Sequence, residues 1–194
     1  MTIVITSGDP SGIGPEIVQK AWICLKKNPL NEFFWIGDPL HLPDSSIPWQ
    51  QIEHPDQASK VFGDALPILI HKFAHPIKVG QHQPENAADI IKVIKRAVSL
   101  VKTNKAKALC TSPINKNVLM SGANFPYTGH TEFLANLDAI DNPVMMLACS
   151  KLKVVPVTTH IPLKDVANRI SKKLLTETIK ITNAAMKEKF GISE

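Results

Sequence analysis

The chain has 194 residues, enough for one sizeable domain or for one domain and part of a second. Hydrophobic residues make up 44% of it and charged residues 20%, which is typical of a folded protein and excludes extensive disorder. The net charge of +5 is spread along the chain, without a basic stripe interleaved with aromatic residues. This charge suits a small anionic substrate and argues against nucleic acid as a partner.

The cysteines and the amino terminus indicate the compartment. Cys24, Cys110 and Cys149 are far apart, form no CxxC pair and lie in apolar runs, so we expect reduced, buried thiols. Met1 leads directly into the strand-like run at residues 3–5, so no signal peptide is expected. No apolar stretch is long enough to span a bilayer. Together these features predict a cytoplasmic protein with no membrane partner.

Strand-like and helix-like segments alternate from the start of the chain. The β-branched run at residues 2–6 predicts a strand, and Pro15 begins a helix that Asn28-Pro29 ends. Residues 33–36 predict a second strand. Residues 40–84 are rich in proline and hold five of the seven histidines. We interpret this region as irregular, with one short strand at Leu66–His71 and surface histidines.

Regular spacing returns after Pro84. Apolar residues from Ala87 to Val101 recur every three or four positions, which predicts an amphipathic helix with Lys92, Lys95 and Arg96 outside. Further strands are expected at residues 108–110, 144–149 and 154–158. Further helices are expected from Glu132 and along a face with Leu175, Ile179, Met186 and Phe190, ending at Gly191. This alternation predicts an α/β fold, with helices on both faces of a parallel or mixed sheet. Another strand would follow, so we expect a truncated chain.

A glycine-rich segment, Gly8–Glu16, joins the first strand to the first helix. It matches no dinucleotide fingerprint, since the third glycine of GxGxxG would fall at Ile17, and no P-loop, since no GK[ST] follows. Glycines let a backbone approach a ligand, and a helix start offers free N–H groups to an anion. Alternatively, the turn only lets the helix pack on the sheet. Both interpretations stay open.

Two later segments carry polar residues next to predicted elements. Lys116 follows the strand that ends at Cys110, where ligands of α/β sheets gather, so it can meet a phosphate or carboxylate. The alternative is a solvated lysine. His130 and Thr131 stand at a helix start, where they can clamp an anion or a hydroxyl group. The alternative is helix capping by Thr128 or Thr131 with an exposed histidine.

The segment Thr158–Leu163 places His160 at the expected carboxyl end of a strand. An imidazole there can bind a divalent metal ion, but one histidine alone is not a metal site, because three or four ligands are needed.

Four segments, taken together in this order and spacing, closely resemble the family of 4-hydroxythreonine-4-phosphate dehydrogenases (PdxA). They are Gly8–Glu16, Ser112–Lys116, Tyr127–Phe133 and Thr158–Leu163. The resemblance runs from the first strand to the end of the chain. It implies an isocitrate/isopropylmalate-dehydrogenase-like fold with two α/β domains around a cleft, truncated here at the carboxyl end. We expect the first domain at residues 1–125 and the start of the second at 126–194.

The resemblance also implies a function. Members oxidise the 3-hydroxyl of 4-phosphooxy-L-threonine with NAD or NADP, and decarboxylation then gives 3-amino-2-oxopropyl phosphate for pyridoxal phosphate synthesis. They act as homodimers with a divalent metal ion (Zn, Mg or Co) held by three histidines from both subunits. His130 and Thr131 match the family's substrate contacts, and His160 matches its first metal histidine. The remaining ligands lie beyond Glu194 in the family, so we expect the chain alone to be inactive.

Three other interpretations remain. A close relative could oxidise another phosphorylated hydroxy acid, such as threonate or erythronate 4-phosphate. A half-domain of the family could serve as a non-catalytic binding module, although His130 and His160 are both present. A phosphate acyltransferase of related fold would bind coenzyme A without a metal, and His160 argues against it.

Overall fold

A computed structural model describes residues 1–192, which divide into two compact units, Met1–Ala139 and the residues from Ile140 onward. No helix within residues 1–192 is both long and apolar enough to cross a membrane.

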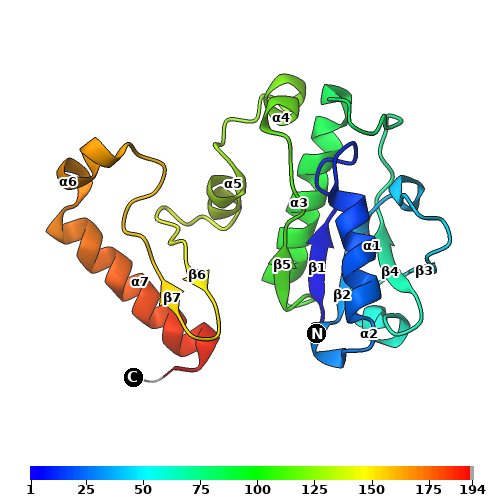
Figure 1. Ribbon diagram of the computed structural model, residues 1–194, viewed down its shortest axis with the longest axis horizontal. Helices are drawn as coiled ribbons and strands as arrows, with labels where there is room; N and C mark the ends of the chain where they lie inside the picture. Colours follow the sequence, from blue (N-terminus) through cyan, green and yellow to red (C-terminus); the bar gives the residue numbers. More distant parts are fainter. Residues whose placement is uncertain (193–194) are drawn as a thin grey trace. The chain divides into compact units, whose positions relative to one another are not determined.

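The first unit is built on a five-stranded parallel sheet with the strand order β3-β4-β2-β1-β5 (Figure 1). The strands are β1 (Ile3–Thr6), β2 (Phe33–Gly37), β3 (Trp49–Gln51), β4 (Leu66–Ile70) and β5 (Ala108–Cys110). The expected α/β class is confirmed. Because all strands are parallel, their carboxyl ends share one edge of the sheet.

Helices cover both faces of this sheet (Figure 1). Every residue of β2 is buried, and alternate residues face α1 (Gly14–Leu25) on one side and α3 (Ala87–Lys102) on the other. On the α1 side, Trp35 packs in one cluster with Trp22, whose indole N–H donates to the carbonyl of Phe62 at 2.8 Å. The run of aromatic residues in β2 therefore forms a core strand between two helical layers.

Two short helices, α4 (Lys116–Ala123) and α5 (His130–Leu137), follow β5 and pack against α3 through a third apolar cluster. The rings of Phe125, Tyr127 and Phe133 meet there with centroids 5.0–5.1 Å apart. Edge-on aromatic contacts of this kind stabilise packing beyond simple burial. This cluster fixes the start of α5 relative to the sheet.

The boundary between the compact units falls between Ala139 and Ile140. Residues 126–139 belong with the first unit because Phe133 is buried in the cluster on α3. The boundary at 125/126 concerns the domains of the complete family fold, and it stays a prediction.

The second unit contains a two-stranded antiparallel ladder and two helices. These are β6 (Leu147–Ala148), β7 (Lys153–Val154), α6 (Val166–Arg169) and α7 (Lys172–Phe190). Gly191 ends α7 with a φ of 64°, as expected for a left-handed helix cap. The strands expected at 144–149 and 154–158 are only two residues long, because each pairs with one neighbour and buries little apolar surface.

The expectation of buried cysteines is wrong, since all three are free and exposed. Cys24 lies on the outer face of α1, Cys110 ends the edge strand β5, and Cys149 lies in the turn between β6 and β7. An apolar run in the sequence does not distinguish an edge strand from a central one.

The region 40–84 is more ordered than its sequence suggests. It holds β3, β4, α2 (Ala58–Val61) and several 3-10 turns. His41 and His71 are partly buried against the ring of Phe73, so they are not surface residues. Arg96 is also partly buried, because its guanidinium donates to the carbonyl of Ile70 at 2.9 Å.

A glycine in α4 allows this helix to pack closely, which generates the first prediction. A Cβ atom on Gly122 would overlap the carbonyl group of Pro84 and press on Ala87, whereas one on Gly63 would meet nothing within 4 Å. We expect Gly122→Ala to lower the free energy of unfolding by about 1–3 kcal/mol, because the backbone cannot yield without strain. Gly63→Ala is the matched control and should change it by less than about 1 kcal/mol. Urea unfolding followed by tryptophan fluorescence measures both, since all three tryptophans lie in the first unit. Equal free energies of unfolding for the two variants would contradict the close packing of α4 against Pro84 and Ala87.

Candidate functional site

The loops that follow β1 and β5 are locked together at the carboxyl edge of the sheet. The backbone N–H of Asp9 donates to Pro113 at 2.9 Å, and that of Ser112 donates to the Thr6 hydroxyl at 3.1 Å. Gly8 lies between them with a φ of 67°, and a Cβ atom there would overlap the Pro113 carbonyl oxygen. The segments Gly8–Glu16 and Ser112–Lys116, which are far apart in the sequence, therefore form one structure at this edge of the sheet.

The glycine-rich loop owes part of its composition to packing. Gly14 begins α1 against the Ser7 carbonyl oxygen, and a Cβ atom would overlap that oxygen. Gly12 is less confined, since a Cβ atom there would lie 3.4 Å from the Asp9 carbonyl oxygen. Close packing thus accounts for Gly8 and Gly14 without a ligand.

A third loop, residues 78–83, joins the same edge, and sequence reasoning missed it. The Ser11 hydroxyl donates to the Gln83 side-chain oxygen at 2.7 Å, and the Gly80 N–H donates to the Ser11 carbonyl at 2.8 Å. The ring nitrogen Nδ1 of His82 lies 2.7 Å from the side-chain nitrogen of Asn115. This loop has no periodicity, so only side-chain contacts in the folded protein identify it.

Asp9 is the acidic group of this edge. It is only 8% exposed, and its carboxylate accepts a hydrogen bond from the Ser11 N–H at 3.0 Å. Burial raises the pKa of Asp9 above its usual range, although the bond from Ser11 and the charge of His82 act against the shift. Asp9 lines an open hollow of about 520 Å³ together with Asn115 and Lys116.

The start of α5 presents a half-buried histidine and an exposed threonine. Its N-cap residue is Gly129, and no side chain caps the helix, so capping by Thr128 or Thr131 is not observed. His130 is half-buried, and its Nε2 atom has no hydrogen-bond partner within residues 1–192. Burial lowers the pKa of His130, so its imidazole is neutral at pH 7. Thr131 is exposed. These groups can donate hydrogen bonds to an oxyanion or a hydroxyl group.

Lys116 and the start of α5 lie side by side. A Cβ atom built on Gly129 would lie 3.7 Å from Lys116 Cε and 3.9 Å from Lys116 Nζ. The structure thus brings Lys116 to His130 and its neighbours, although the sequence separates them by a helix and a loop.

His160 lies in the second unit, and its position differs from the expected one. It is exposed and has a φ of 58°, in a bend well beyond the end of β7 at Val154. Within residues 1–192, no group of three His, Cys, Asp or Glu side chains could hold a metal ion. The described residues alone therefore do not fit a metal site.

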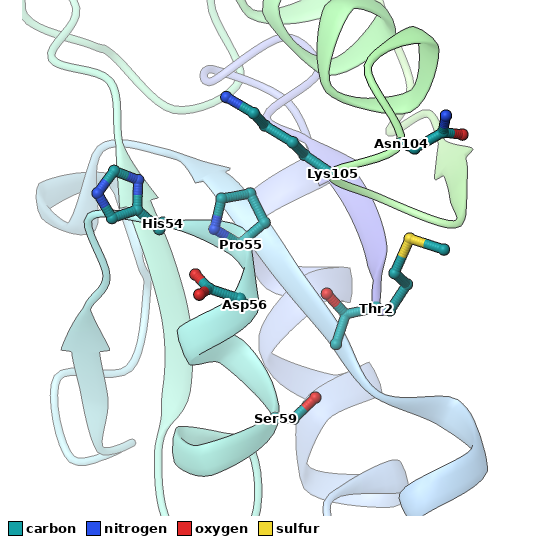
Figure 2. A pocket seen from close by; sticks show the side chains of 8 residues that line it. Thr2, His54, Pro55, Asp56, Ser59, Asn104 and Lys105 are labelled. Carbon is teal, nitrogen blue, oxygen red and sulfur yellow. The ribbon is translucent and has the colours of Figure 1, made fainter.

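A more enclosed hollow, of about 460 Å³, lies at the opposite edge of the sheet, at the amino ends of β1 and β5. Figure 2 shows Thr2 and Lys105 on one side of it and His54, Pro55 and Asp56 on the other. None of the expected site residues lines it. The carboxyl edge is the better candidate, because three loops and the start of α5 supply its polar groups.

The first unit thus defines an α/β protein whose polar loops gather beyond the carboxyl ends of a parallel sheet, the usual ligand side of such folds. A sequence model of one family, described as "Pyridoxal phosphate biosynthetic protein PdxA", matches residues 29–194. The chain belongs to the PdxA family, as its four segments indicate.

Individual relatives agree with this assignment. A 4-hydroxythreonine-4-phosphate dehydrogenase from Ruegeria sp. is 46% identical over 98% of this chain and 58% of its own length. A crystal structure of a 4-hydroxythreonine-4-phosphate dehydrogenase from Burkholderia phymatum superposes on this chain with a TM-score of 0.88 at 32% sequence identity. The match covers 100% of this chain and 60% of the Burkholderia chain. A crystal structure of a terephthalate 1,2-cis-dihydrodiol dehydrogenase from Burkholderia xenovorans is similar in fold, with a TM-score of 0.66 at 17% sequence identity. The chain spans about 58% of the length of the curated relatives that it matches.

The raised pKa of Asp9 generates a prediction about stability. Because the folded-state pKa lies above the ordinary value of 3.8, burial disfavours the carboxylate, and stability is lost as the pH rises through the folded-state pKa. We expect Asp9→Asn, which keeps an oxygen acceptor for Ser11, to gain stability relative to the native chain between pH 4 and pH 7. Urea unfolding at several pH values measures this difference, with Asp64→Asn at an exposed position as the control for loss of one charge. A pH-independent difference for Asp9→Asn would rule out the buried carboxylate as its cause.

Proposed function

We propose that this chain supplies the substrate-binding part of a 4-hydroxythreonine-4-phosphate dehydrogenase. The observation that carries the proposal is the start of α5, where an uncapped helix end meets a neutral, half-buried histidine whose Nε2 atom has no partner within the described chain. Relatives that carry the name of this enzyme align over nearly the whole chain. The intact enzyme would oxidise the 3-hydroxyl of 4-phosphooxy-L-threonine with NAD or NADP, and the resulting 3-oxo acid would lose carbon dioxide.

His130 and Thr131 are the proposed substrate contacts. A neutral imidazole can donate one hydrogen bond and accept another, so His130 can bind a hydroxyl group or a phosphate oxygen without a full charge. The Thr131 hydroxyl adds a donor, and the helix dipole favours a negative ligand at this end of α5, which no side chain caps. Together these groups would bind and orient the substrate while the hydroxyl is oxidised.

We also propose that His160 supplies one ligand to a divalent metal ion (Zn, Mg or Co) in the intact enzyme. Its positive φ supports a specific role, because non-glycine residues in this conformation are uncommon and gather at functional sites. The other ligands would come from outside the 194 residues. Such an ion would polarise the reacting oxygen when bound. We propose a homodimer and a cytoplasmic location on the basis of the same family resemblance.

The proposed activity is tested by joining this chain to the carboxyl-terminal part of the Ruegeria relative that it does not cover. We expect the 194 residues alone to be inactive and the joined protein to reduce NAD or NADP with 4-phosphooxy-L-threonine. His130→Ala in the joined protein should lower kcat/KM about ten- to a hundred-fold, the cost of one strong hydrogen bond of about 1.5–3 kcal/mol. Steady-state kinetics measure the effect.

The exposed His75→Ala provides the matched control and should leave kcat/KM unchanged. Threonate and erythronate 4-phosphate, tested in parallel, show whether a related hydroxy acid is the better substrate. Unchanged kinetics of His130→Ala with the best substrate would contradict the assignment. Mass spectrometry of each preparation excludes contaminating enzyme from the host.

A further inference from the structure

Lys116 has a fixed place at the beginning of α4. The side chain of Asn115 caps this helix by accepting hydrogen bonds from the N–H groups of Asn117 and Val118 at 3.0 and 3.3 Å. Val118 is buried in the apolar cluster on α3, so the first turn is held from both sides. Lys116 is exposed, but its backbone belongs to a rigid, capped turn.

The side chain of Lys116 links the two halves of the candidate site, which are the loops at the carboxyl edge of the sheet and the start of α5. Lys116 lines the open hollow that Asp9 also lines, and its amine lies beside Gly129 at the start of α5. The carboxylate of Glu132 also approaches this glycine, with Oε2 3.7 Å from where a Cβ atom would be. The Lys116 amine and the Glu132 carboxylate thus both border the start of α5, and of these two groups the amine is the one that attracts an anion.

We infer that Lys116 binds an oxyanion of the substrate, a phosphate or a carboxylate group, at the start of α5 beside His130 and Thr131. This inference rests on the proposed function, since it assigns a further positioning residue to the same site. A lysine amine binds phosphate and carboxylate groups as a compact positive charge with three donors. Lys116 would hold the anionic group while His130 and Thr131 contact it or the neighbouring hydroxyl group.

The absence of a side chain at Gly129 leaves the space that the anion needs. Gly129 has an extended backbone, with φ 179°, that any residue can adopt. A methyl group there would make ordinary contact with Lys116 and Glu132, at 3.7–3.9 Å, and would fill the space beside the amine. Gly129→Ala is therefore expected to fold normally and to weaken anion binding.

The test uses the full 194-residue chain and measures dissociation constants by NMR titration of backbone amides. The ligands are inorganic phosphate, 4-phosphooxy-L-threonine and its dephosphorylated form, 4-hydroxy-L-threonine. We expect Lys116→Gln to weaken binding of the phosphorylated substrate about tenfold or more, as for loss of a charge-assisted hydrogen bond. Lys116→Arg should keep most of the affinity. The exposed Lys95→Gln on α3 is the matched control for net charge and should behave as the native chain does.

The ligands separate the two oxyanions. Weakened binding of inorganic phosphate and of the phosphorylated substrate alone assigns Lys116 to the phosphate, whereas weakened binding of both amino acids assigns it to the carboxylate. Either result supports the inference. Equal dissociation constants for Lys116→Gln and the native chain with every ligand would overturn it, as would no binding by the native chain.

The same titrations distinguish a failure of the Lys116 inference from a failure of the proposed function. If Lys116 is needed for inorganic phosphate but the native chain binds the phosphorylated substrate no more tightly than phosphate, the inference holds and the substrate assignment fails. If the phosphorylated substrate binds tightly in a His130-dependent manner but independently of Lys116, the function holds and the inference fails. The amide shifts of residues far from α5 report whether each variant keeps the native fold.

Discussion

The site depends on one constraint, the direct backbone contact between the loop after β1 and the loop after β5. Asp9 donates to Pro113 there, and Gly8 has no side chain that would separate the two strands of chain. β1 and β5 are neighbours in the sheet, so both loops emerge at the same edge. The contact fixes Asp9 and the segment that leads into α4, and through α4 it fixes the position of Lys116.

The aromatic cluster of Phe125, Tyr127 and Phe133 provides the second support. It seats α5 on α3, and the start of α5 at Gly129 lies beside Lys116, the first residue of α4. Stable apolar packing thus holds a turn in which the Nε2 atom of the half-buried His130 has no hydrogen-bond partner within residues 1–192. Such an unsatisfied atom costs stability in the free protein and is expected where a ligand binds.

Much of the fold was predictable from the sequence, because its longer helices have clear periodicity and its central strands are short apolar runs. Pro15 at the start of α1 and Gly191 at the end of α7 marked helix ends correctly. The exposure of Cys110 was not predictable, because it depends on β5 being an edge strand, and strand order is a long-range property.

The candidate site was predictable only in part. The family segments identified His130, Thr131 and His160, but they could not show that Lys116 reaches Gly129, which depends on how α4 and α5 pack on α3. The contribution of His82 and Gln83 could not be predicted either, because these residues lie in an irregular loop without a pattern.

The second unit buries less apolar surface than the first. Thr178 is the buried residue of its helix α7, whereas Leu175, Ile179 and Phe190 of the same helix are exposed. The chain spans about 58% of the length of the relatives that it matches. The first unit, in contrast, has three buried apolar clusters and both halves of the candidate site.

The most direct measurement is a crystal structure of this chain joined to the carboxyl-terminal part of the Ruegeria relative, with 4-phosphooxy-L-threonine bound. We predict an oxyanion of the ligand at the first turn of α5, within about 2.7–3.2 Å of donor nitrogens there. The His130 ring and the Lys116 amine should both contact the ligand. A ligand bound instead at the amino edge of the sheet, between Thr2 and Lys105, would contradict the account.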